Sequence, residues 1–214
     1  MAGTSAPPSS SERQWFIASR WQEYEGEGRA NLIRILAVAA FYVVELINYY
    51  GLNLGFVEFP QQTERSLHLA ITMLTFAWTM VCLGVLLCRT NYVFPASLKY
   101  ISTGCDLVLL TAILALADGP KSGLVIAYFL VVALACLRFH LPLIWFVTAG
   151  AIGGYLVLVG HAYWYAEKNR IERYKQLLFL LALAFTGIIL GQVIRRVRHL
   201  ALRYAEQSRP GGGT

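Results

Sequence analysis

Residues 141–165, LPLIWFVTAGAIGGYLVLVGHAYWY, contain no Asp, Glu, Lys or Arg. About 20 apolar residues are enough for a helix to cross the roughly 30 Å hydrocarbon core of a bilayer. This stretch therefore predicts a transmembrane helix. Five further apolar stretches predict the same structure: 31–50, 66–88, 98–117, 123–137 and 177–197. The stretch 123–137 is the shortest of the six.

The composition of the whole chain agrees with six such helices. Of 214 residues, 57% are hydrophobic and 14% are charged, whereas soluble domains have about 25% charged residues. The mean hydropathy is +0.54. A water-soluble enzyme is excluded, and the short connections between the stretches force neighbouring helices to run in opposite directions. We expect an all-α integral membrane bundle of six transmembrane helices, up and down.

The distribution of basic residues predicts how the bundle is oriented. Lys and Arg gather in both terminal segments and in the connections after the second and fourth stretches. The positive-inside rule then places both termini in the cytoplasm. We expect residues 1–28 to form a cytoplasmic interfacial segment, 29–198 the transmembrane domain, and 199–214 a juxtamembrane helix with a flexible tail. The net charge of +6 reflects this topology, and we expect no nucleic acid partner.

Ionisable groups at membrane depth are costly and are therefore functional candidates. In the expected topology Glu45, His68 and His161 come from three different helices and share a level near the extracytoplasmic face. One carboxylate with two imidazoles suits Zn, Fe or Cu with an open position. With His68 and His161 alone, a b-type haem could lie between the second and fifth helices. The alternative is that these histidines bond to headgroups or loops.

A second carboxylate, Asp106, falls inside the third stretch. Ser102 and Thr103 precede it by one turn and offer local hydroxyl partners. We interpret Asp106 as a functional intramembrane carboxylate that acts as a proton-binding or signalling switch, or as a buried group that fixes the third helix against its neighbours.

The two ends of the chain carry patterns of their own. At the C-terminal end Ile194, Val197, Ala201 and Tyr204 recur at spacings of three, four and three residues. This heptad-like seam predicts a signalling helix that leaves the membrane, or a basic tail held to anionic lipid. At the N-terminal end four aromatic residues among charges predict an amphipathic helix at the headgroup level: Trp15, Phe16, Trp21 and Tyr24.

Two GxxxG spacings, Gly150/Gly154 and Gly187/Gly191, allow close helix approach. We favour packing inside the bundle over a dimer interface, because this pattern is common.

The middle of the chain resembles a known family. The runs LKYISTGCDLVLLT (98–111), DGPKSGL (118–124) and YFLVV (128–132) resemble the six-helix membrane input modules of bacterial redox-responsive sensor histidine kinases and membrane-bound class III adenylate cyclases. Asp106, Thr111, Gly119 and Ser122 match the family pattern, and Gly123 stands where proline is usual. The resemblance covers about a third of the chain.

The resemblance implies a bacterial inner-membrane domain that senses a ligand, quinone or redox state and moves a helix toward a cytoplasmic output. It also implies b-type haem in some relatives. We therefore expect a non-catalytic sensor or anchor module, a homodimer in the bilayer, that acts on a cytoplasmic kinase or cyclase partner. The alternatives are a haem- or metal-binding subunit in quinone-linked electron transfer, and a small proton-coupled transporter.

Overall fold

The computed structural model describes residues 10–53, 58–59, 65–91, 97–138, 140–165 and 170–207. The chain is almost entirely helical, as the apolar patterning predicts. Two 3-10 turns, η1 (Gly119–Lys121) and η2 (Gly123–Ile126), precede α4, and two-residue strands β1 (Leu52–Asn53) and β2 (Glu58–Phe59) pair antiparallel after α1. The helices are α1 (Ser10–Tyr50), α2 (Arg65–Thr90), α3 (Leu98–Leu116), α4 (Ala127–Cys136), α5 (Leu141–Trp164) and α6 (Arg173–Gln207).

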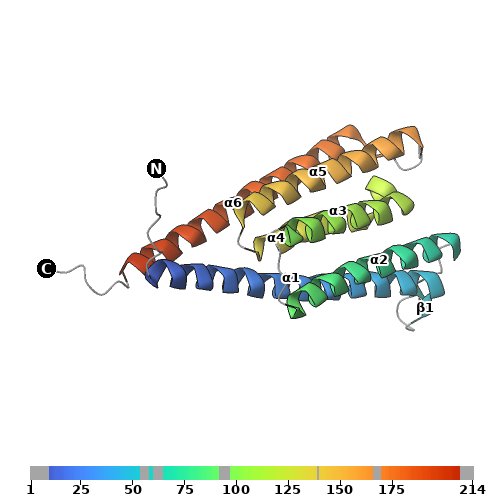
Figure 1. Cartoon of the computed structure of the whole chain (residues 1–214). Coiled ribbons are helices and arrows are strands. Elements are labelled where there is room, and N and C mark those ends of the chain that lie inside the picture. Colours follow the sequence, from blue (N-terminus) through green and yellow to red (C-terminus); the bar gives the residue numbers. More distant parts are fainter. Residues whose placement is uncertain are drawn as a thin grey trace, which may run out of the picture.

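The helices run along roughly one common axis (Figure 1). Helix α1 packs on α2, α2 on α3, α3 on α5 and α5 on α6, while α4 contacts α1, α3, α5 and α6. The first turns of α1 and the last turns of α6 extend past the other helices at the same end of the bundle (Figure 1). We call this the terminal end, and we call the opposite end, where β1 and β2 lie, the hairpin end.

Five helices in the described part of the chain are long and apolar enough to cross a membrane: α1, α2, α3, α5 and α6. Helix α4 is shorter than these five. With η2 it covers Gly123–Cys136, close to the predicted stretch 123–137, and 14 helical residues reach only about 21 Å. The sequence Asp118-Gly119-Pro120 determines where this segment begins, because Gly119 takes a positive φ of 59° and two 3-10 turns follow before α4 begins.

One side of helix α4 is buried in the core. Tyr128 and Val132 are fully buried, and the Tyr128 hydroxyl lies 2.7 Å from the Thr111 Oγ1 of α3. Large apolar side chains on the outer helices are exposed, among them Met73, Phe76 and Leu178. A surface of this kind is typical of a helix bundle that faces acyl chains.

The glycine pairs pack inside the bundle, as the sequence favoured. A Cβ on Gly154 would lie 2.7 Å from Thr111 Oγ1 and 2.8 Å from the Tyr128 hydroxyl, and a Cβ on Gly187 would collide with Thr148 of α5. These contacts are closer than real Cβ atoms show. The absence of side chains there lets α3, α5 and α6 approach one another.

The two terminal helices extend across the expected domain boundaries. Helix α1 runs without a break from Ser10 to Tyr50, so residues 10–28 are helical and continue into the first apolar stretch. The side chains of Trp15, Phe16, Trp21 and Tyr24 lie outside the described part. Helix α6 is likewise continuous from Arg173 to Gln207, and residues 208–214 are not described.

Candidate functional site: a buried charge cluster at the terminal end

Helix α1 carries three polar side chains on one face near the terminal end. Glu27, Asn31 and Arg34 are spaced by four and three residues, and side chains at these spacings share a face. Their exposed fractions are 1%, 5% and 3%. These three polar side chains therefore point into the interior of the bundle.

Arg34 forms a buried ion pair with Asp106 of α3. The Arg34 Nη2 and Nε lie 2.7 and 2.9 Å from Asp106 Oδ2, and the Trp78 indole N–H of α2 donates to Asp106 Oδ1 at 2.8 Å. Arg34 also donates to Asn31 Oδ1 at 3.0 Å, and the Asn31 amide donates to the Cys82 carbonyl at 3.2 Å. One carboxylate thus joins α1, α2 and α3.

A second buried ion pair joins α1 to the turn between α4 and α5. Arg138 Nη2 lies 2.6 Å from Glu27 Oε1. The same guanidinium donates to the Lys99 carbonyl at 2.9 Å and to the hydroxyls of Ser102 and Thr103 on α3. Burial lowers the pKa of Arg138 from its ordinary value, and the nearby Glu27 carboxylate opposes this effect.

Backbone packing supports this second pair. A Cβ on Gly26 would lie 2.8 Å from the Leu137 carbonyl oxygen. Only glycine allows α1 to approach the α4–α5 turn this closely, because the obstacle is backbone and cannot rotate away. The close approach brings Glu27 within reach of Arg138.

We call Glu27, Arg34, Asp106 and Arg138 the charge cluster. They are the buried charged side chains within the described residues, and their formal charges sum to zero. Burying a charge without a partner is expensive, and the effective penalty is several kcal/mol per ion. The cluster avoids that penalty only while α1, α3 and the α4–α5 turn keep their relative positions.

The partners of Asp106 differ from those expected. Ser102 and Thr103 bond to the Lys99 carbonyl and accept from Arg138, and they do not bond to Asp106. The reason is geometric: a hydroxyl three or four residues back prefers its own helix carbonyl. Asp106 is left to bind cationic and indole donors from α1 and α2.

At the hairpin end the structure brings together two of the three predicted metal ligands. Glu45 Oε1 lies 3.5 Å from His68 Nδ1, and the side chains are 14% and 12% exposed. The His68 ring stacks on Tyr49 with 3.8 Å between centroids. Within the described part of the chain, neither Oε1 nor Nδ1 has a hydrogen-bond partner.

His161 does not join that pair. It is exposed on α5 and faces Tyr165, with 5.5 Å between ring centroids, and α5 packs on α3, α4 and α6. The described residues contain no group of three His, Cys, Asp or Glu side chains that could hold a metal ion. The predicted three-ligand set therefore does not fit this structure.

The residues of the predicted C-terminal heptad-like seam differ in burial. Ile194 is 2% exposed and belongs to the core, whereas Val197 is 43% exposed. The side chains of Ala201 and Tyr204 lie outside the described part, although both residues are helical.

Sequence reasoning identified Asp106 and missed its partners. In the sequence, Arg34 near the start of the first stretch and Arg138 after the fourth count toward the positive-inside pattern, and Glu27 falls within the expected interfacial segment 1–28. The spacing of Glu27, Asn31 and Arg34 on one face of an apolar helix is the signal that could have identified the α1 part of the cluster.

No protein-family model, curated protein or solved structure matches the chain. The resemblance to sensor input modules stays a prediction, and the function is inferred from the geometry of the bundle.

Proposed function

We propose that the chain is a non-catalytic sensor or anchor module of the bacterial inner membrane. It passes changes within its transmembrane bundle to a cytoplasmic kinase or cyclase effector through the helices that extend from the terminal end. The observation that carries this proposal is the position of the charge cluster. The cluster joins α1, α2, α3 and the α4–α5 turn where α1 and α6 extend past the other helices.

The cluster is suited to coupling because its energy depends sharply on helix position. An ion pair buried in a medium of low polarity weakens quickly when its atoms separate, and each freed charge then carries its own desolvation penalty. If α1 or α3 shifts, the charged side chains of the cluster therefore gain more by forming new ion pairs than by keeping the present pairs at longer distances. A bundle held in this way has discrete arrangements, which a two-state signal requires.

The path to α6 runs through α5. Arg138 lies directly before α5, which packs on α6 through the close contact of Thr148 with Gly187. A change at the α4–α5 turn would reach α6 as a movement of one packed helix along another. The last turns of α6 would carry that movement to the effector.

The test measures whether the cluster controls the terminal helices. Spin labels are attached at Arg29→Cys on α1 and Leu200→Cys on α6 in a variant without native cysteines, reconstituted in nanodiscs. Both positions are exposed. We expect Arg138→Gln to shift or broaden the distance distribution, because Glu27 loses its counter-charge.

The matched control is Lys175→Gln, which removes an exposed cation of α6 that lies 3.0 Å from the Glu172 carboxylate. We expect it to leave the distribution unchanged. A folded Arg138→Gln variant with the wild-type distribution would contradict the proposal.

The proposed homodimer uses the exposed side of α6. Val197 and Leu200 are 43% and 53% exposed, whereas Ile194 faces the bundle core. Single cysteines at Val197 and Leu200 should form disulfide-linked dimers in membranes, and a cysteine at Ile194 should not. Equal cross-linking at all three positions would indicate random collision.

The transporter alternative would use the two intramembrane carboxylates. Asp106 is bonded to Arg34 and Trp78, which favours a fixed structural role over repeated proton exchange. Glu45 keeps an unbonded oxygen beside His68 within the described part. Proton flux into liposomes that is lost in Glu45→Gln and kept in Asp106→Asn would promote this alternative.

A further inference from the structure

Three exposed arginines lie along α6 where this helix leaves the bundle. The apolar span of α6 ends at Val197, and the last turns extend past the other helices at the terminal end (Figure 1). Arg195, Arg196 and Arg203 are exposed, and we call them the basic face. Arg196 and Arg203 lie about 200° and 180° around the helix from the buried Ile194. The basic face therefore points away from the bundle core.

The charges of the basic face are not balanced within the described part of the chain. No hydrogen bond or ion pair engages its three arginines there. By contrast, Arg29 at the same end of the bundle is paired with Glu25 at 2.6 Å. Residues 195–207 contain four arginines and one acidic residue, Glu206. This segment of α6 therefore carries a net positive charge.

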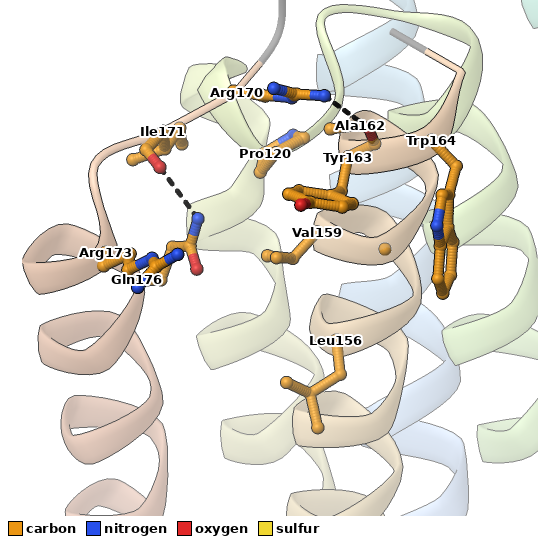
Figure 2. A pocket seen from close by; sticks show the side chains of 11 residues that line it. Pro120, Leu156, Val159, Ala162, Tyr163, Trp164, Arg170, Ile171, Arg173 and Gln176 are labelled. Carbon is orange, nitrogen blue, oxygen red and sulfur yellow. Dashed lines mark hydrogen bonds between the residues drawn. The ribbon is translucent and has the colours of Figure 1, made fainter. Parts of the chain in front are cut away.

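Among the described residues, the hairpin end of α6 has no comparable face. Figure 2 shows a pocket of about 490 Å³ between α5 and α6 at that end. Arg170 lies at its upper end and donates to the Tyr163 carbonyl at 2.8 Å. Arg173 lies lower, at the height of Val159 (Figure 2). The two arginines of this end therefore do not form one cationic surface.

The basic face lies at the level of the lipid headgroups. A headgroup layer of about 5–7 Å covers each side of the hydrocarbon core. Arg195 and Arg196 fall in the last turn of the apolar span, and their long side chains reach this layer. Arg203 lies beyond Val197 by about 9 Å along the helix axis, and charges act over about 8 Å at physiological ionic strength. All three arginines are therefore within range of headgroup phosphates.

We propose that the basic face binds anionic phospholipid headgroups in the leaflet at the terminal end. The phosphates supply the counter-charges that the described residues lack. Lipid is favoured over an acidic protein because Arg195 and Arg196 lie inside the headgroup layer, where lipid is always the neighbour. The bound headgroups hold the last apolar turn of α6 at a fixed depth. This inference is independent of the proposed signalling function, because it requires only that α6 crosses the bilayer.

The test is native mass spectrometry of the full chain, released from detergent in the presence of phosphatidylglycerol or of phosphatidylcholine with the same acyl chains. We expect wild type to retain phosphatidylglycerol preferentially. Arg196→Gln should lower this preference about fivefold, since one basic residue near an anionic surface contributes about that factor. The triple variant Arg195→Gln/Arg196→Gln/Arg203→Gln should lower it further.

Two control variants separate the basic face from general attraction. Arg195→Lys/Arg196→Lys/Arg203→Lys keeps the charge, and we expect it to keep the preference. Glu25→Gln/Arg29→Gln removes an exposed cation at the same end whose charge is already balanced, and the preference should be unchanged. Thermal unfolding in the same detergent checks that every variant is folded.

Four outcomes would overturn the proposal. An unchanged preference in the triple glutamine variant would show that the basic face is not used, and an equal loss in Glu25→Gln/Arg29→Gln would show diffuse attraction. Displacement of the lipid by glycerol 3-phosphate, which has no acyl chain, would show a site for soluble phosphate. Polyglutamate that binds the chain in phosphatidylcholine nanodiscs, but neither binds the triple glutamine variant nor competes with phosphatidylglycerol, would indicate an acidic protein partner instead.

Discussion

The ion pair between Arg34 and Asp106 allows a quantitative test of how the bundle is held together. Arg34→Met leaves a carboxylate that is 4% exposed without its counter-charge. Asp106→Asn leaves the guanidinium unpaired but keeps an oxygen for the Trp78 indole N–H. Removing one partner of a buried pair costs about 3–5 kcal/mol. We expect each single variant to lower the free energy of unfolding by about that amount.

The double variant Arg34→Met/Asp106→Asn separates the pair from its surroundings. It leaves no uncompensated charge, and replacing a buried pair by neutral groups is often close to neutral for stability. We expect the double variant to be more stable than the sum of the single effects predicts by at least about 2 kcal/mol. The measurement is unfolding in mixed micelles by titration with sodium dodecyl sulfate, followed by tryptophan fluorescence.

The same helix supplies a matched control. Arg29 and Glu25 also form an ion pair at 2.6 Å, but their side chains are 71% and 51% exposed. An exposed pair four residues apart on a helix contributes only about 0.3–0.5 kcal/mol. A double-mutant cycle on Glu25→Gln and Arg29→Gln should therefore give a small coupling energy. Equal coupling energies for the two pairs would refute the reasoning that burial, and not distance, determines the energy.

Three further predictions concern packing, cofactor and topology. Gly154→Val should lower the free energy of unfolding by about 1–3 kcal/mol, because the new side chain meets Thr111. Gly153→Val should lower it less, because a Cβ there meets open space. Thermal unfolding in detergent compares the two variants. The absorption spectrum of the purified protein should show no Soret shift on adding dithionite, because His68 stacks on Tyr49 of α1 whereas His161 lies beside Tyr165 at the end of α5; a shift that His68→Ala removes would restore the haem alternative. Reporter fusions to the two ends of the chain should indicate the same side of the membrane, since α1 begins and α6 ends at the same end of the bundle, and opposite sides would contradict the six-span topology.

Hydropathy predicted the helices well because the bilayer requires long apolar runs. It also located the fourth helical segment, since the predicted stretch 123–137 corresponds to η2 and α4, Gly123–Cys136, but it did not show that this segment begins with 3-10 turns. Gly119 and Pro120 open two 3-10 turns, and the remaining helix is only 10 residues long. An apolar run of this length fits a buried core helix as well as a membrane span, and composition alone cannot distinguish them.

The candidate site was predicted only in part, for a related reason. A carboxylate inside an apolar stretch, such as Asp106, stands out in a sequence, whereas an arginine near the end of a stretch resembles a topology signal. The pairing of Arg138 with Glu27 depends on how helices are ordered and rotated in the bundle. Neither property follows from the periodicity of a single helix, so the partners of a buried charge could not be read from the sequence.

The contact between Glu27 and Arg138 also has a consequence for how the protein is made. The two residues are 111 positions apart, and at about 5–20 residues per second a ribosome needs roughly 6–22 s to add the second after the first. For that time Glu27 has no Arg138 to neutralise it, so this part of α1 must wait near water or beside an insertion factor. Nascent chains arrested before Arg138 should therefore keep Glu27 accessible to aqueous reagents, and longer chains should protect it.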